Sequence, residues 1–235
     1  MVILHGNNML TIALLIYKSK RWLDFCLDSL NEAENETPFN ILVVANDPFP
    51  EIEADPRVSY IHRNPNPEEH YLTRVYRAWN KAVEIADTEH VCLVNSDMYF
   101  ADGWVDALMR HIDGLTLPTS LLVESGRIPS AFGEYVRDFG RTPGEFDKEA
   151  FRQHAELLKS NSTQAGRLFM PVVFHRQTFM DLGGYPEGNV KQDHYVVSGD
   201  QFLFNRYLDK GYSWITVNNS IVYHAIEGEM RDNEQ

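Results

Sequence analysis

The chain has 235 residues and a formal net charge of −13, because 34 acidic residues outnumber 21 lysines and arginines. With 43% hydrophobic and 23% charged residues, its composition matches an average soluble globular protein, which excludes disordered, collagen-like and coiled-coil classes. So acidic a surface repels nucleic-acid backbones and anionic lipid, and a phosphate-bearing ligand would need a cation to reverse the local charge.

The two cysteines, Cys26 and Cys92, lie in apolar runs and cannot build a disulfide framework.

The longest apolar run, residues 10–17, is much shorter than the ~20 residues that a membrane-spanning helix needs. No basic segment precedes this run and no small-residue cleavage site follows it, so it does not have the pattern of a secretory signal. We therefore expect a cytoplasmic protein that has no transmembrane segment and no nucleic-acid partner.

Residues 10–111 alternate between strand-like and helix-like patterns. The strand-like runs are continuous and apolar, as in strands covered on both faces, and the helix-like segments carry apolar residues at helical spacing. The expected strands are 10–17, 40–46, 58–62 and 90–97, and the expected helices are 21–33 and 69–86. This alternation predicts an α/β fold with a mostly parallel central sheet flanked by helices.

The second half of the chain is less regular. Residues 112–166 contain scattered prolines and glycines and one expected helix, at Lys148–Leu158, and we interpret them as a variable insertion or lid within a single domain, 1–235. After this stretch, the patterns predict strands at 167–176, 212–217 and 220–225, and helices at 177–184 and 199–211. The acidic tail, 225–235, is expected to be frayed.

Polar residues stand where several of the expected strands end. These residues are Tyr17, Asn46 with Asp47, and Asn95-Ser96-Asp97. In open α/β sheets, ligands bind beyond the carboxyl ends of the strands. Neither a GxGxxG fingerprint nor a GxxxxGK[ST] phosphate loop is present, but the oxygen donors of "NSD" suit Mg²⁺ or Mn²⁺. Taken alone, "NSD" is also typical of a strand-to-helix turn with an aspartate cap.

Several motifs follow one another in a fixed order. They are "CLDSL" at 26–30, "VVAN" at 43–46, Asn80 with Ala82, "NSD" at 95–97, "GWV" at 103–105, "RQTFMDLGGYPEG" at 176–188 and "GDQFLFNRYLDKGYSWITVNNSIVYH" at 199–224. In this order they resemble a family 2 glycosyltransferase with the GT-A fold, over most of 10–224 except 112–166. The resemblance implies one GT-A (Rossmann-like) domain, with 10–111 as the nucleotide-sugar-binding half and 167–224 as the acceptor and catalytic half.

The resemblance implies metal-dependent transfer of a sugar, with inversion, from a nucleoside diphosphate donor to a hydroxyl of a glycan or other acceptor. A UDP-sugar is favoured and a GDP-sugar is possible. Asp97 matches the last acid of the DxD motif, which ligates Mn²⁺ or Mg²⁺, while Asn95 stands at the first position, where the family often has aspartate. His224 matches a late histidine that serves as a second metal ligand; as an alternative, it is a half-buried strand histidine.

The resemblance also implies a general base, which takes the proton of the acceptor hydroxyl. Asp200 matches the aspartate of an "ED" pair, and Gly199 stands where the glutamate would be. Asp193 is the second candidate, and a helix N-cap is the structural alternative for Asp200.

Contacts to the nucleotide sugar are expected from side chains at the strand ends and on the helix 69–86. The positions are Tyr17, Asn46, Asp47, Arg74, Asn80, Asn95, Ser96 and Asp97. Ala45 stands where the second strand usually ends in aspartate, so either Asp47 reaches the base from two residues further on or the selectivity for the base is relaxed. Arg74 is placed to approach the phosphates, or it is a solvated helix charge.

Two other functions stay open. The departures at Ala45, Asn95 and Gly199 are compatible with a degenerate GT-A domain that binds a nucleotide or glycan without catalysis. A sugar nucleotidyltransferase has a related nucleotide-binding half, but it would normally carry a glycine-rich loop after the first strand, and "LLIYKSKRW" has no glycine.

Overall fold

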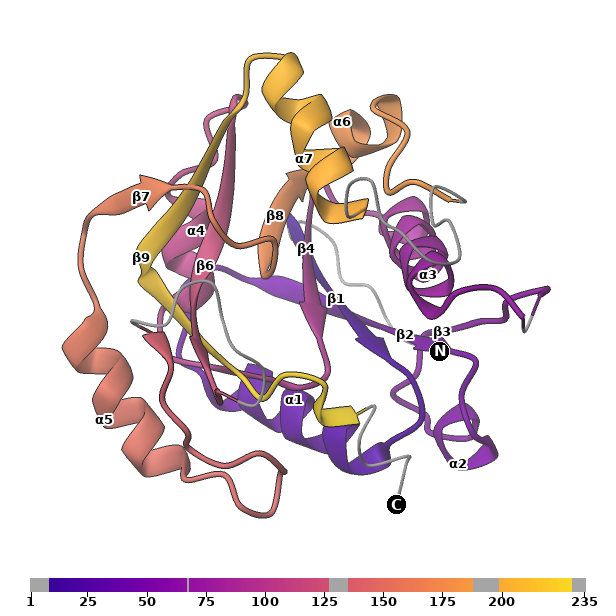
Figure 1. The fold of residues 1–235 in the computed structure, drawn as a ribbon, viewed down its shortest axis with the longest axis horizontal. Helices are drawn as coiled ribbons and strands as arrows, with labels where there is room; N and C mark the ends of the chain where they lie inside the picture. Colours follow the sequence, from indigo (N-terminus) through magenta and orange to yellow (C-terminus); the bar gives the residue numbers. More distant parts are fainter. Residues whose placement is uncertain (1–8, 67, 127–134, 188–198, 230–235) are drawn as a thin grey trace.

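One nine-stranded sheet organises the part of the chain that the computed structural model describes, residues 9–66, 68–126, 135–187 and 199–229 (Figure 1). The strand order is β3-β2-β1-β4-β8-β6-β9-β5, and β7 pairs with β9 outside this path. The strands are β1 (Leu10–Ile16), β2 (Phe39–Asn46), β3 (Tyr60–His62), β4 (His90–Asn95), β5 (Met98–Phe100), β6 (Thr116–Glu124), β7 (Thr163–Ala165), β8 (Val172–His175) and β9 (Ser213–His224).

Most strands of the sheet run in one direction. Strands β1, β2, β3 and β4 are mutually parallel. Strand β8 is antiparallel to both β4 and β6, and β6 is parallel to β9, so β6 and β9 run in the same direction as β1 to β4. The predicted mostly parallel α/β fold is confirmed, and the carboxyl ends of six strands lie at one edge of the sheet.

Helices cover both faces of the sheet (Figure 1). They are α1 (Lys20–Glu32), α2 (Pro50–Glu53), α3 (Tyr71–Ile85), α4 (Trp104–Met109), α5 (Lys148–Leu158), α6 (Arg176–Asp181) and α7 (Gly199–Asp209). Alternate residues of β1 join different hydrophobic clusters: Ile12 belongs to the cluster that holds residues of α1, α4 and α5, and Ala13 to the cluster that holds residues of α3, α6 and α7. Among the described helices, none is both long and apolar enough to cross a lipid bilayer.

Two elements of the second half differ from the sequence-based expectation. Strand β6 falls inside 112–166, yet it lies within the sheet between β8 and β9, so only the residues that follow it are available for a surface insertion. The expected strands 212–217 and 220–225 are one strand, β9. The polar residues between them are accommodated because the pairing register shifts there and because Asn218 hydrogen-bonds Ser162 and Gln164, beside and within β7.

The start of the acidic tail is packed, contrary to the expectation that it is frayed. Ala225 and Glu229 are only 1% and 8% exposed, and the backbone N–H of Ala225 donates to the carbonyl of Asp97. Residues 225–229 therefore belong to the folded domain and lie at the edge where the parallel strands end.

Candidate functional site

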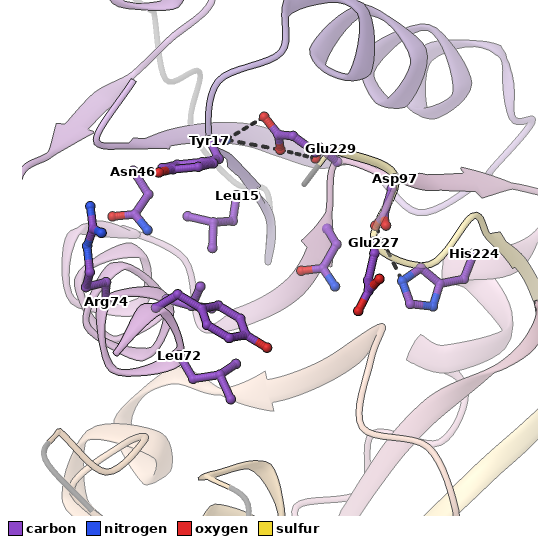
Figure 2. Close-up of a pocket in the computed structure, with 13 residues that line it drawn as sticks. Leu15, Tyr17, Asn46, Leu72, Arg74, Asp97, His224, Glu227 and Glu229 are labelled. Atoms are coloured by element: carbon purple, nitrogen blue, oxygen red, sulfur yellow. Dashed lines mark hydrogen bonds and ion pairs between the residues drawn. The ribbon is translucent and has the colours of Figure 1, made fainter. Parts of the chain in front are cut away.

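A pocket of about 440 Å³ opens at the carboxyl edge of the sheet (Figure 2). The ends of β1, β2, β4 and β9, the first turns of α3 and the segment 225–229 line it. Of the residues predicted from the sequence, it brings together Tyr17, Asn46, Arg74, Asn95, Ser96, Asp97 and His224. The pocket therefore lies where ligands bind in open α/β sheets.

The buried Asp97 and the partly buried His224 form a pair at one end of this pocket (Figure 2). The imidazole Nε2 lies 3.4 Å from Asp97 Oδ1. Strand pairing brings the two residues together, because Asp97 directly precedes β5 and Met98 of β5 pairs with His224 of β9. A second bond holds the carboxylate from the other side: the backbone N–H of Gly228 donates to Asp97 Oδ2 at 3.1 Å.

Each member of this pair shifts the pKa of the other. Burial raises the pKa of Asp97, but the charge of His224 and the hydrogen bonds outweigh it and lower the net value. Burial lowers the pKa of His224, but Asp97, with a contribution from Glu124, outweighs it and raises the net value to about 10. The histidine is thus a charged ion-pair partner, and a metal ion that binds it must displace its proton.

The pair suits a hard divalent cation. A carboxylate oxygen and an imidazole nitrogen match the ligand preferences of Mn²⁺, and the buried Nδ1 of His224 has no hydrogen-bond partner among the described residues. In that same part of the chain, no group of three or more histidine, cysteine and acidic side chains is arranged to hold a metal ion. Two protein ligands therefore fit a site that phosphate oxygens and water would complete.

The other end of the pocket carries Tyr17, Asn46 and Arg74 (Figure 2). Arg74 is not a solvated helix charge, because its guanidinium forms an ion pair with Asp47 and its side chain is only 19% exposed. Burial raises the pKa of Asp47, but its bonds to Arg74 and Asn64 lower the net value. Arg74 lines the pocket, whereas Asp47, which was predicted to contact the nucleotide, does not. Asp47 instead orients the guanidinium of Arg74.

Comparisons with known proteins support the fold. No protein-family model and no curated protein matches the sequence. Three solved structures match with TM-scores of 0.60, 0.58 and 0.58: GalNAc-T7 with UDP, GalNAc and Mn²⁺; S. aureus TarS 1–349; and the mannosyltransferase PcManGT from Pyrobaculum calidifontis with GDP-Man and Mn²⁺. Their sequence identities to this chain are 14%, 13% and 15%, and the matches cover 92%, 95% and 93% of it.

All three structures are GT-A-type glycosyltransferases. The chain has a GT-A fold. It spans about half the length of these solved structures, with 43%, 62% and 57% of their chains covered. The expected GT-A resemblance is therefore confirmed at the level of the fold.

Asn80, predicted to contact the nucleotide, lies outside the pocket of this GT-A domain. Its side chain accepts from the backbone N–H of Tyr185 at 2.8 Å and donates to the carbonyl of Tyr185 at 2.9 Å and to Glu187. It lines a separate cavity with Gly183 and Arg206, among others. The structure thus gives Asn80 a bridging position between α3 and the "GGY" segment.

Asp200 lies within the first turn of α7 and does not line the pocket. The hydroxyl of Tyr76, on α3, donates to its Oδ2 at 3.4 Å, and Val75, the neighbour of Tyr76, lines the pocket. Burial raises the pKa of Asp200 to about 6, although the Tyr76 bond opposes this shift. Burial therefore brings the pKa of this carboxyl group toward neutral, and the group lies outside the lining of the pocket. Asp193, the second candidate base, lies outside the described residues.

The position of Tyr76 explains why residue 199 is a glycine, where the family pattern has a glutamate. A Cβ at position 199 would lie 2.2 Å from Tyr76 Cε2, and the backbone N–H of Gly199 donates to the Tyr76 hydroxyl at 3.1 Å. The tyrosine ring thus fills the space that a side chain at 199 would need.

We expect Gly199→Ala to destabilise the fold by about 1–3 kcal/mol, the usual cost of an overpacked core position. Urea unfolding measures this change. Gly144→Ala is the matched control, because a Cβ there meets only the side chain of Arg21, at 3.7 Å. Equal free energies of unfolding for the two variants would contradict the proposed fit between Gly199 and Tyr76.

Sequence reasoning missed three acids of the site: Glu124, Glu227 and Glu229. Glu227 and Glu229 line the pocket, and Glu124 Oε1 lies 3.9 Å from Nδ1 of His224. Glu124 ends β6 and pairs in register with His224, so the sheet register positions it. Glu124 could have been found only if β6 had been predicted as a strand, and the two acids of the tail carried no signal.

Proposed function

We propose that this chain is a metal-dependent glycosyltransferase. It transfers a sugar from a nucleoside diphosphate donor to a hydroxyl of a glycan or other acceptor, with inversion at the anomeric carbon. The observation that carries the proposal is the Asp97–His224 pair, which lies in a 440 Å³ pocket at the carboxyl edge of a GT-A sheet. Two of the similar structures support it, since GalNAc-T7 was solved with UDP, GalNAc and Mn²⁺ and PcManGT with GDP-Man and Mn²⁺.

The two ends of the pocket suit the two ends of such a donor. Asp97 and His224 would hold Mn²⁺ or Mg²⁺, with Asn95-Ser96-Asp97 as a DxD-type motif. A bound ion would supply Lewis-acid stabilisation of the charge that develops on the leaving diphosphate. At the other end, Tyr17, Asn46 and Arg74 would face the nucleoside, because the ion pair with Asp47 already balances the charge of Arg74. A UDP-sugar is the favoured donor and a GDP-sugar the second.

Asp200 is the proposed general base. Its carboxylate accepts the proton of the acceptor hydroxyl as the hydroxyl oxygen attacks the anomeric carbon and the bond to the diphosphate breaks. A carboxyl pKa near 6 suits this role, because the group is ionised at neutral pH and is a stronger base than an ordinary carboxylate. Asp193 is the alternative base.

The test is the release of nucleoside diphosphate from a panel of UDP- and GDP-sugars, with Mn²⁺ or with a chelator. We expect Mn²⁺-dependent release from one donor. Tight nucleotide binding without turnover of any donor, in the presence of candidate acceptors, would favour the degenerate GT-A domain. Pyrophosphate-dependent breakdown of the donor to a nucleoside triphosphate would instead identify a nucleotidyltransferase.

A further inference from the structure

Glu229 is a buried carboxylate that joins the tail to two other segments of the site. It is 8% exposed. Its Oε1 accepts the backbone N–H groups of Tyr17, Lys18 and Ser19 at 3.0, 2.5 and 2.8 Å. Its Oε2 accepts the hydroxyl of Ser96 at 2.7 Å, and Figure 2 shows the bonds that reach from Glu229 to Tyr17. The side chain therefore connects the end of β1 to the middle residue of the "NSD" motif.

The backbone next to Glu229 is fixed by close packing. A Cβ at Gly228 would lie 2.4 Å from the ring of Trp22, so only glycine allows this approach. The N–H of Gly228 donates to Asp97 Oδ2, and the N–H of Ala225 donates to the carbonyl of Asp97. Residues 225–229 thus hold Asp97 and place the Glu229 carboxylate beside the same motif.

The placement of Glu229 matters because of the charge at position 95. The first position of the DxD-type motif is the neutral Asn95, so the motif has one negative charge fewer than two acids would give it. Glu229 brings a carboxylate into contact with Ser96, the residue between Asn95 and Asp97. It also lines the same pocket as Asn95 and Asp97.

We propose that Glu229 replaces the missing first acid of the motif as the source of negative charge for a divalent cation in the pocket. This inference rests on the proposed function. Both carboxylate oxygens already accept hydrogen bonds, so Glu229 acts as a positioning residue through Ser96 and through its charge, and not as a metal ligand. A negative charge near the cation stabilises it through a low-dielectric protein interior more strongly than through water.

The test moves the charge from one position to the other. The dissociation constant of Mn²⁺ is measured from the free-ion electron paramagnetic resonance signal, with saturating UDP or GDP, whichever stabilises the wild-type chain. We expect Glu229→Gln to weaken Mn²⁺ binding by about 10–100-fold, as is usual when a residue that supports metal ligands is changed. The double variant Asn95→Asp/Glu229→Gln should regain affinity to within a few-fold of wild type. Glu156→Gln, at an exposed position of α5, is the matched control and should bind as wild type does.

Three outcomes decide the inference. Wild-type affinity in Glu229→Gln overturns it. A double variant as weak as Glu229→Gln also overturns it, because Glu229 would then act only by holding the tail in place, whatever its charge. If the wild-type chain binds no Mn²⁺ with either nucleotide, the proposed function itself fails, and the inference fails with it. Recovery in the double variant, with the circular dichroism of all variants unchanged, supports it.

Discussion

Asp97→Asn is expected to abolish the Mn²⁺-dependent stabilisation of the chain by a nucleoside diphosphate. A ligand at 100 times its dissociation constant stabilises a folded protein by ~2.7 kcal/mol, which for a chain of this size raises Tm by roughly 5–10 °C. Asparagine keeps an oxygen that accepts the Gly228 N–H, but it removes the charged metal ligand. Thermal unfolding with UDP or GDP, with and without Mn²⁺, measures the loss.

The substitution also breaks a buried ion pair, so the ligand-free variant should be less stable by roughly 3–5 kcal/mol. For this reason, each ligand-induced shift in Tm is taken against the same variant without ligand. Asp113→Asn is the matched control, since this exposed aspartate precedes β6 at the opposite edge of the sheet. A full Mn²⁺-dependent shift in Asp97→Asn would remove Asp97 from the metal site.

Asp200→Asn should lower turnover by about 10²–10⁴-fold, the usual contribution of a general base. Because Asp200 does not line the pocket, the Mn²⁺-dependent binding of the nucleotide should not change. Steady-state kinetics and thermal shift, measured on the same variant, separate the two effects. In the wild-type chain, turnover should rise with pH through about 6, since only the ionised carboxylate accepts a proton.

The same variant should be more stable than wild type at pH 8. The folded chain holds the pKa of Asp200 at about 6, above its ordinary value of 3.8. The stability that the neutral carboxyl contributes is therefore complete below pH 3.8 and is lost as the pH rises through 6. Asparagine never ionises, so the expected gain at pH 8 is about 2–3 kcal/mol, and it should shrink at pH 5.

Asp209→Asn, at the exposed end of α7, is the matched control and should change neither turnover nor Tm. Full turnover in Asp200→Asn would assign the base role elsewhere, with Asp193 as the first alternative. An equal change in Tm at pH 5 and pH 8 would show that the carboxyl of Asp200 does not titrate in the folded chain between them.

Strands β1 to β4 and helices α1 and α3 could be predicted because the strands are apolar runs and the helices carry apolar residues at helical spacing, whereas the short elements α2, β5 and α4 were missed. Asp97 could be proposed because it follows such a strand and parallel strands end at a common edge, whereas His224 was proposed from its match to the family's late histidine. Strand β6 was missed because Pro118 and the surrounding irregular composition obscured a nine-residue strand inside the sheet.

The parts of the site that the sequence could not predict depend on contacts between distant residues. Glu229 bonds to Tyr17, 212 residues earlier in the chain, and nothing in "EGEMRDNEQ" distinguishes its second glutamate. Asn80 carries a family motif, yet its position is set by the backbone of Tyr185, 105 residues later. Asp200 accepts a hydrogen bond from Tyr76, 124 residues earlier, whose ring needs a glycine at 199.

The most direct measurement is the Tm of the wild-type chain with UDP, GDP, CDP and dTDP, each with and without Mn²⁺. The account predicts a shift of several degrees for one nucleotide, UDP before GDP, that disappears when Mn²⁺ is removed. That result would establish the Asp97–His224 end of the pocket as part of a metal-dependent donor site. No Mn²⁺-linked shift with any of the four nucleotides would contradict the account and leave a GT-A fold without its proposed donor.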